Sequence, residues 1–153
     1  MAAEEEIKVD YYEQALLLAD RDAGAVNSDV FNLLETAHKQ GDIRATYALG
    51  SWYLHGKYVD KNVKQGIELI LTAAQSGNAD ALYDLANIYE EGKELPKDKR
   101  KAFLYYVEAA LSGDKQSIYE VYRCYFHGIG TRRDKELAEV WYVVSQRLGV
   151  ADE

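Results

Sequence analysis

The sequence predicts an all-α protein, a superhelix of about four helix-turn-helix units, on the strength of three observations. The segments ATYALGSWYLHG, ALYDLANIYEEG and SIYEVYRCYFHG share one pattern and begin at residues 45, 81 and 117, which gives a period of 36 residues. Two series of glycines recur with the same period. A single proline leaves the helices almost without breakers. A fixed period of this length is typical of stacked helical hairpins.

The first unit is expected at about residues 5–41 and is degenerate. Residues 10–22 and 28–41 have the composition of two helices, but Asp20 stands where later units have a glycine at the hairpin. An atypical first unit is expected in a solenoid, because one face of a terminal repeat meets water instead of a neighbour.

Three full units are expected to follow within one domain of residues 1–153, at residues 42–77, 78–113 and 114–149. In the first of these, helical spacing places Ala45, Leu49 and Trp52 on a buried face, and Gly56 is expected to end the helix in a left-handed conformation. Each second helix follows a polar loop and closes at a glycine. The expected amino-terminal caps of these second helices are Asn62, Asp98 and Asp134.

The pattern Ala-x-x-x-Leu-Gly-x-x-Tyr-x-x-Gly resembles the Sel-one-like repeat (SLR), a relative of the tetratricopeptide repeat with a longer loop between its helices. The pattern is complete at Ala45, Leu49, Gly50, Tyr53 and Gly56. The resemblance covers roughly residues 28–149. It implies a right-handed superhelix of helix pairs and the role of an adaptor that binds other proteins, and it implies no catalytic residue.

The third full unit departs furthest from this pattern, with Ser117, Val121 and Tyr122 at the first three motif positions. Tyr122 replaces a small residue, so we expect looser helix packing or a small shift there.

Charge and cysteine content narrow the function classes. The formal net charge of −8 argues against nucleic acid, because phosphate binding needs a basic surface. The only cysteine, Cys124, excludes an internal disulfide and fits a reducing compartment. The start MAAEEEIKVD is not a secretory signal, and no apolar run is long enough to span a membrane. A cytoplasmic protein without a membrane partner is therefore expected.

A stripe along the first helices is the candidate protein-binding site. Columns that recur form the scaffold, whereas columns that differ between units are free for recognition, and first helices are expected to line the concave side. Tyrosines border the stripe as candidate anchors. The alternative is that the stripe is an ordinary solvated face. The predicted residues are Arg44, Tyr47, Ala48, Ser51, His55, Asp80, Tyr83, Asp84, Asn87, Glu91, Gln116, Tyr119, Glu120, Arg123 and His127.

The middle unit is acidic, with Asp80, Asp84, Glu90 and Glu91 close together in sequence, so a basic segment of a partner protein is predicted to bind there. The C-terminal helix offers a second candidate interface at Val140, Val143 and Val144. No further repeat covers that end, which predicts a homodimer or an end-on partner. The alternative is that the tail at residues 150–153 or a neighbouring loop covers it.

Catalysis, metals and cofactors are not predicted. His55 and His127 stand two units apart, too far to share a metal ion, and Cys124 takes a core position. The sequence therefore predicts a non-enzymatic protein-binding module, an adaptor or scaffold. The alternative is a bacterial immunity protein that neutralises a secreted toxin by binding it. A hydrolase would require a defined pocket around Cys124 or the histidines.

Overall fold

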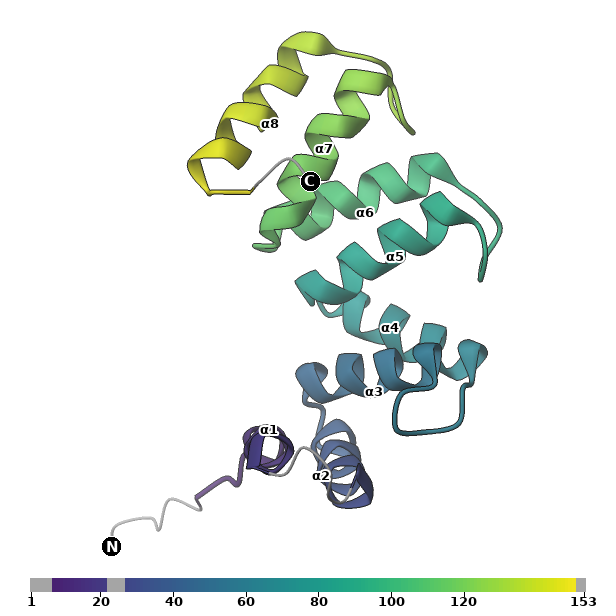
Figure 1. The fold of residues 1–153 in the computed structure, drawn as a ribbon, viewed down its shortest axis with the longest axis vertical. Coiled ribbons are helices and arrows are strands. Elements are labelled where there is room, and N and C mark those ends of the chain that lie inside the picture. The colour runs from purple at the N-terminus through teal and green to yellow at the C-terminus, as the bar shows by residue number, and fades with distance from the viewer. Residues whose placement is uncertain (1–6, 22–26, 151–153) are drawn as a thin grey trace, which may run out of the picture.

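The computed structural model describes residues 7–21 and 27–150, and the regular secondary structure of this part of the chain consists of α-helices. The helices follow one another in a curved stack from α1 at one end to α8 at the other (Figure 1). Antiparallel neighbours pack as pairs, and the four pairs agree with the predicted units. The helices are α1 (Tyr11–Arg21), α2 (Asn27–Lys39), α3 (Ile43–His55), α4 (Val63–Gln75), α5 (Ala79–Glu91), α6 (Lys99–Leu111), α7 (Lys115–His127) and α8 (Lys135–Arg147).

The first helix of each full unit has the same two end signals. At the start, the side chain of Asp42, Asn78 or Asp114 accepts a hydrogen bond from a backbone N–H of the first turn. At the end, a glycine takes a left-handed conformation, and Gly56 has φ 65°. These signals fix α3, α5 and α7 at one length, which keeps the columns of the repeat in register.

The second helices begin at the predicted caps, because the side chains of Asn62, Asp98 and Asp134 accept from the N–H three residues later. Their ends differ slightly from the prediction. The cap residues are Ser76, Ser112 and Leu148, and the left-handed glycine is the next residue in each case. The glycine therefore turns the chain into the following unit after the helix has ended.

Small residues bring the two helices of a unit together. A Cβ atom at Gly66 on α4 would lie 2.6 Å from the backbone nitrogen of Leu54 on α3, so only glycine allows this approach. The first motif position of the full units also holds a small residue, and Ala45, Ala81 and Ser117 are fully buried there. Close contact of helix backbones therefore sets the geometry of the α3–α4 pair.

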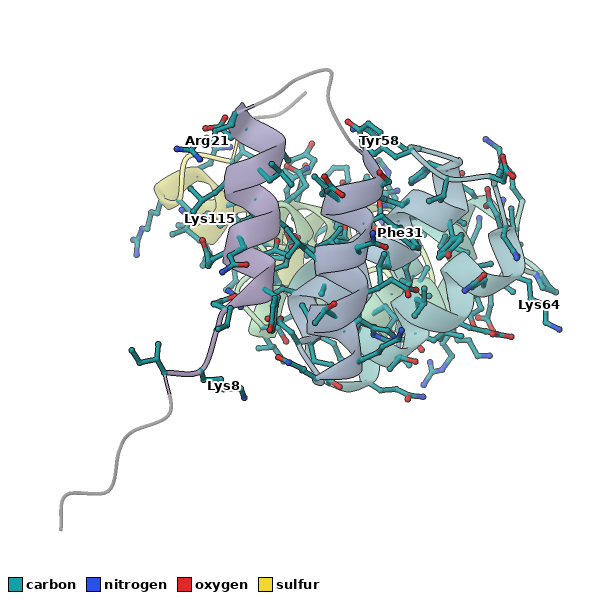
Figure 2. All side chains as sticks on the ribbon, turned by 90° about the horizontal axis from the view of Figure 1, so that it is seen from below. Lys8, Arg21, Phe31, Tyr58, Lys64 and Lys115 are labelled. Atoms are coloured by element: carbon teal, nitrogen blue, oxygen red, sulfur yellow. The ribbon has the colours of Figure 1, made fainter. Side chains whose placement is uncertain are left out.

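Trp52 was expected in the interior, but it is only partly buried. Its ring stacks on Phe31 of α2 with the ring centroids 6.4 Å apart, and its centroid lies 4.8 Å from that of Tyr58 in the α3–α4 loop. Seen along the stack from the α1 end, Phe31 and Tyr58 lie on the same side of the molecule (Figure 2). The indole ring is too large for the space that Ile88 and Cys124 fill in later units, so it packs at the edge of the core.

The last pair packs around aromatic rings. The ring centroid of Tyr122 lies 5.1 Å from that of Tyr142 on α8, 5.3 Å from that of Tyr119 and 5.6 Å from that of Phe126. The positions equivalent to Tyr122 are Gly50 and Ala86, and both are buried. The looser packing expected at Tyr122 stays a prediction, and its ring occupies a position that a small residue has in the other two full units.

The first helices lie on the inner side of the curve. In the described part of the chain, side-chain hydrogen bonds link α1 to α3 through Glu13, α3 to α5 and α5 to α7, whereas none links two second helices. Short side-chain contacts between alternate helices require that these helices lie close together. We therefore call the surface formed by α1, α3, α5 and α7 the inner face.

Candidate protein-binding face

The predicted stripe lies along α3, α5 and α7, and it divides into two groups by exposure. Most of its members are half-buried between neighbouring helices. The members that are exposed to solvent are Arg44, His55, Asp80, Glu91, Gln116 and His127.

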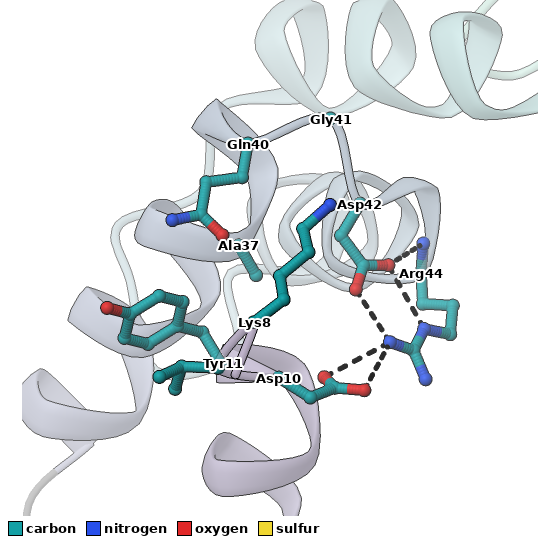
Figure 3. Close-up of a pocket in the computed structure, with 9 residues that line it drawn as sticks. Lys8, Asp10, Tyr11, Ala37, Gln40, Gly41, Asp42 and Arg44 are labelled. Carbon is teal, nitrogen blue, oxygen red and sulfur yellow. Dashed lines mark hydrogen bonds and ion pairs between the residues drawn. The ribbon is translucent and has the colours of Figure 1, made fainter. Parts of the chain in front are cut away.

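At the first junction, Arg44 joins α3 to the start of α1. Its guanidinium group bonds Asp42 at 2.7 Å and Asp10 at 3.1 Å (Figure 3). It also lies over the ring of Tyr12, at 4.4 Å from the ring centroid. The backbone N–H of Glu13 and then Arg44 hold the pKa of Asp10 below the usual 3.8 by hydrogen bonding, and Arg44 does the same for Asp42. Asp10, Asp42 and Arg44 line a surface pocket beside the start of α1, so an internal ion-pair cluster occupies the wall of this pocket.

At the junction between α3 and α5, a hydroxyl group holds a carboxylate. The Tyr47 hydroxyl donates to Asp84 Oδ2 at 2.9 Å. Burial raises the pKa of Asp84 above the usual 3.8, the Tyr47 hydrogen bond and His55 oppose this shift, and the charges of Asp80 and Asp114 add to it. No ion pair of Asp84 with a lysine or arginine is found in the described part of the chain.

At the junction between α5 and α7, a guanidinium group bridges two carboxylates. Arg123 donates to Glu90 on α5 and to Glu120 on its own helix, both at 2.7 Å. The hydroxyl of Tyr106 on α6 lies 2.8 Å from both Glu90 Oε2 and Asn87 Oδ1. Its one hydrogen is best donated to the carboxylate, which is the stronger acceptor.

These contacts give a second explanation for the positions that vary between units. Tyr47 lies in a column that is tyrosine in every unit, whereas Asp84, Glu120 and Arg123 lie in columns that differ between units. Each of these three residues contributes to a junction with its own chemistry. Variation between units was interpreted as freedom for recognition, but at these positions it reflects contacts within the stack. The exposed members and the charge that the junctions leave unbalanced are what a partner can reach.

The acidic group differs in membership from the predicted one. Glu90 belongs to the compensated junction: burial alone would raise its pKa, but hydrogen bonds from Arg123 and Tyr106 outweigh burial and hold it below the usual 4.5. Asp114 takes its place beside Asp80 and Asp84, since its charge raises the pKa of Asp84. Negative charge is therefore concentrated at the junction between α3 and α5.

A shallow hollow opens at this junction, between the end of α3 and the end of α5. Its floor is apolar, because Leu54 and Ile88 line it and are both only 6% exposed. Its rim is acidic and carries Asp84, Glu91 and Glu94. We call this the acidic hollow, and its remaining lining residues are His55 and Asn87. An apolar floor under an acidic rim suits the alkyl stem and the cationic head of a lysine or arginine side chain.

Two residues of this surface were missed in the sequence. Glu94 lies in the polar loop KELPKD, which was interpreted only as a connection between helices. Asp114 was hidden because its column, with Asp42 and Asn78, is a helix cap, and it does cap α7 by accepting from Ser117. The signal that could have indicated Glu94 is its position in the loop directly after the acidic end of α5.

The three predicted C-terminal valines are exposed. The expected reason was that no further repeat covers them, and this reason applies only to Val143, because the equivalent residues of the inner units are half-buried within the stack. Val140 and Val144 are 58% and 38% exposed. The cover by residues 150–153 that was considered falls mostly outside the described residues, although Val150 is buried. The positions equivalent to Val140 and Val144 are exposed in the inner units as well, at Glu68, Thr72, Leu104 and Glu108.

The surface of α8 that corresponds to the contact with a next unit is polar. Glu139 is exposed, whereas its equivalents Ile67 and Phe103 are buried. Gln146 is exposed, whereas Ala74 is buried. The missing repeat is therefore the wrong explanation for the exposure of Val140 and Val144.

Catalytic and metal chemistry find no support in the described residues. Cys124 is completely buried, and burial raises the pKa of its thiol to about 12, so it packs as a core residue. No group of three or more histidine, cysteine, aspartate or glutamate side chains in residues 7–21 and 27–150 has the geometry of a metal site. None of the described helices has the length and hydrophobicity needed to cross a bilayer.

The family model for the Sel1 repeat matches residues 43–78, 79–114 and 123–143. The chain belongs to the Sel1 repeat family. The third Sel1 repeat is matched only in part, and the unmatched start of α7 contains Ser117, Val121 and Tyr122, where the pattern departs furthest. Sel1 repeat proteins are generally protein–protein interaction modules, and the Sel1 repeat is a non-catalytic interaction fold.

Solved Sel1 repeat structures have the same architecture. The chain is similar to a Sel1 repeat protein from Oxalobacter formigenes, with 22% identity and a TM-score of 0.83 over 91% of this chain and 57% of that one. It is also similar to a protective antigen of uropathogenic Escherichia coli with an SLR fold, with 24% identity and a TM-score of 0.77 over 93% of this chain and 34% of that one.

A third similar structure is the Helicobacter pylori cysteine-rich protein B, with 23% identity and a TM-score of 0.62 over 82% of this chain and 92% of that one. At these identities the likeness concerns the fold, and the chain spans little more than half, or about a third, of the first two structures. Comparison with curated proteins gives no match.

Proposed function

We propose that this Sel1 repeat chain is a non-enzymatic adaptor whose inner face binds a basic segment of a partner protein, with the acidic hollow as the main contact. The observation that carries the proposal is the hollow itself: two buried apolar residues, Leu54 and Ile88, form the floor beneath the carboxylates of Asp84, Glu91 and Glu94. A lysine or arginine of the partner would place its alkyl stem on this floor and its charge at the rim.

Electrostatics supports the same choice of partner. Burial raises the pKa of Asp84, and repulsion from the charges of Asp80 and Asp114 adds to this shift. A cation bound at the rim would relieve this repulsion, so part of the binding free energy would come from charge that the fold leaves unbalanced. The stack holds these side chains in place before binding, which lowers the ordering cost on this side of the complex.

Two narrower roles use this surface. As an adaptor, the chain would bind several partners with modest affinity. As an immunity protein, the alternative considered from the sequence, it would form one tight complex of equal stoichiometry with a basic toxin. Stoichiometry and affinity of the natural complex separate the two roles. The cytoplasmic location expected from the sequence stays a prediction under either role.

The test is a binding titration with octalysine at low salt, followed by fluorescence anisotropy of a dye on the peptide. The double variant Glu91→Gln, Glu94→Gln is expected to weaken binding by roughly tenfold, as the loss of two close charge contacts implies. Binding should also weaken as salt is added.

The matched control is Glu68→Gln, Glu108→Gln, which removes the same charge from exposed positions on α4 and α6. It is expected to change affinity far less than the variant of the hollow. Equal losses in the two double variants would show that octalysine responds only to net charge, and the proposal would then fail.

A further inference from the structure

The last helix carries an apolar stripe on its outer surface. Leu137, Val140, Val144 and Leu148 are between 38% and 58% exposed and follow one another at intervals of three or four residues. This spacing places them along one side of a helix. α8 lies at the outer end of the stack, with no further helix beside it in the described chain (Figure 1). The equivalent positions in α4 are all polar: Gln65, Glu68, Thr72 and Ser76.

The sequence of the stripe is nearly symmetrical about Tyr142. If a second α8 is laid antiparallel across this point, Leu137 faces Leu148 of the second copy and Val140 faces Val144. The midpoints of these two pairs coincide within one residue, or about 1.5 Å along the helix axis. A two-fold interface requires this property, because residue i must meet residue j while j meets i.

The charges beside the stripe have the same symmetry. Glu136 and Arg147 are exposed and border the stripe on one side, and the described chain holds no ion pair of either residue. The antiparallel arrangement brings Glu136 next to Arg147 of the second copy, twice in the same interface. Opposite charges therefore meet along one edge of the apolar seam, once toward each of its ends.

We propose that two copies of this chain form a two-fold dimer by antiparallel pairing of α8 through Leu137, Val140, Val144 and Leu148. The seam is about three helical turns long, so it buries less than the roughly 1,200–2,000 Å² of a stable complex, and the dimer dissociates on dilution. Val143, which was predicted with the other two valines, lies outside the seam. The pairing uses the outer surface of the last helix and does not depend on binding at the inner face.

Sedimentation equilibrium over a wide concentration range tests the dimer. The wild-type chain is expected to shift from monomer to dimer as concentration rises. The variant Val140→Glu, Val144→Glu is expected to raise the dissociation constant by at least about tenfold, because two apolar contacts are lost on each copy. The control is Leu104→Glu on α6, at the position equivalent to Val140 and 46% exposed, which should leave the dissociation constant unchanged.

Charge exchange tests the orientation. Glu136→Arg and Arg147→Glu each place like charges opposite one another and should weaken the dimer, whereas the double variant restores opposite charges and should recover it. Both substitutions are at exposed positions, and circular dichroism checks that each of the three variants is folded. A monomer at every concentration would overturn the dimer, and a double variant weaker than both single ones would overturn the antiparallel pairing.

Discussion

The junction between α3 and α5 holds a carboxylate with a hydroxyl group, whereas the junction between α5 and α7 holds two carboxylates with a guanidinium group. Both junctions tie one first helix to the next, and both use residues in variable columns. They differ in charge. Arg123 forms ion pairs with Glu90 and Glu120, whereas Tyr47 is an uncharged donor and does not balance the charge of Asp84. The same scaffold therefore has a charge-balanced junction between α5 and α7 and a junction between α3 and α5 that can attract a cation.

The difference shows what variation between repeats means in this chain. A column that changes from unit to unit can be a private contact or a recognition position, and only the three-dimensional partners separate the two. Arg123 and Glu91 were equivalent candidates in the sequence. In the structure Arg123 lies between two acids, while Glu91 stands at the rim of the acidic hollow with Lys93 3.6 Å away.

Loss of the guanidinium group should have the largest effect on stability. Arg123→Met would leave Glu90 and Glu120 half-buried without their cation, so we expect the free energy of unfolding to fall by about 1 to 3 kcal/mol. Urea unfolding followed by circular dichroism measures this. Arg132→Met, at an exposed loop position, is the matched control and should change stability little. An equal loss in both variants would mean that the α5–α7 junction contributes nothing specific.

Loss of the hydroxyl group at the other junction should cost less. Tyr47→Phe removes the donor to Asp84 and keeps the ring, so stability is expected to fall by about 1 kcal/mol, the usual contribution of a single hydrogen bond. The same urea measurement applies, with Tyr58→Phe as the control, because the Tyr58 side chain is exposed. A Tyr47→Phe variant as stable as the wild type would show that water replaces the hydroxyl without cost.

The smallest effect is a difference in pH dependence between the two carboxylates of α5. The folded pKa of Asp84 is raised, so its stability contribution is complete below 3.8 and is lost as pH rises through the folded pKa. The folded pKa of Glu90 is lowered, so its contribution is present above 4.5 and is lost as pH falls through the folded pKa.

Two variants measure this difference by urea unfolding at a series of pH values from 3 to 7. Relative to the wild type, Asp84→Asn should gain stability as pH rises, while the loss in Glu90→Gln should grow as pH rises. Parallel profiles for the two variants would contradict the assignment of one compensated and one uncompensated junction.

Much of the fold follows from the sequence because the repeat supplies its own internal comparison. The period placed the helix pairs, and the caps at Asn62, Asp98 and Asp134 are confirmed. Trp52 was misplaced because its column contains smaller residues, and equivalence of position does not guarantee equivalence of size.

The candidate site was less accessible to sequence reasoning. Which carboxylates remain uncompensated depends on partners in other units, such as Arg123 for Glu90, and the spacing within one helix carries no information about them. Exposure of Val140 and Val144 was predicted, but the reason emerged only from the burial of the equivalent positions in the inner units.

Chemical-shift mapping of backbone amides during an octalysine titration tests the central claim most directly. The uncompensated junction predicts that the largest changes gather around the acidic hollow, at His55, Asp84 and Glu91 and in the loop at Glu94, with little change around Glu120 and Arg123. Shifts of similar size at both junctions, or shifts that gather on α7 and spare α5, would contradict the account.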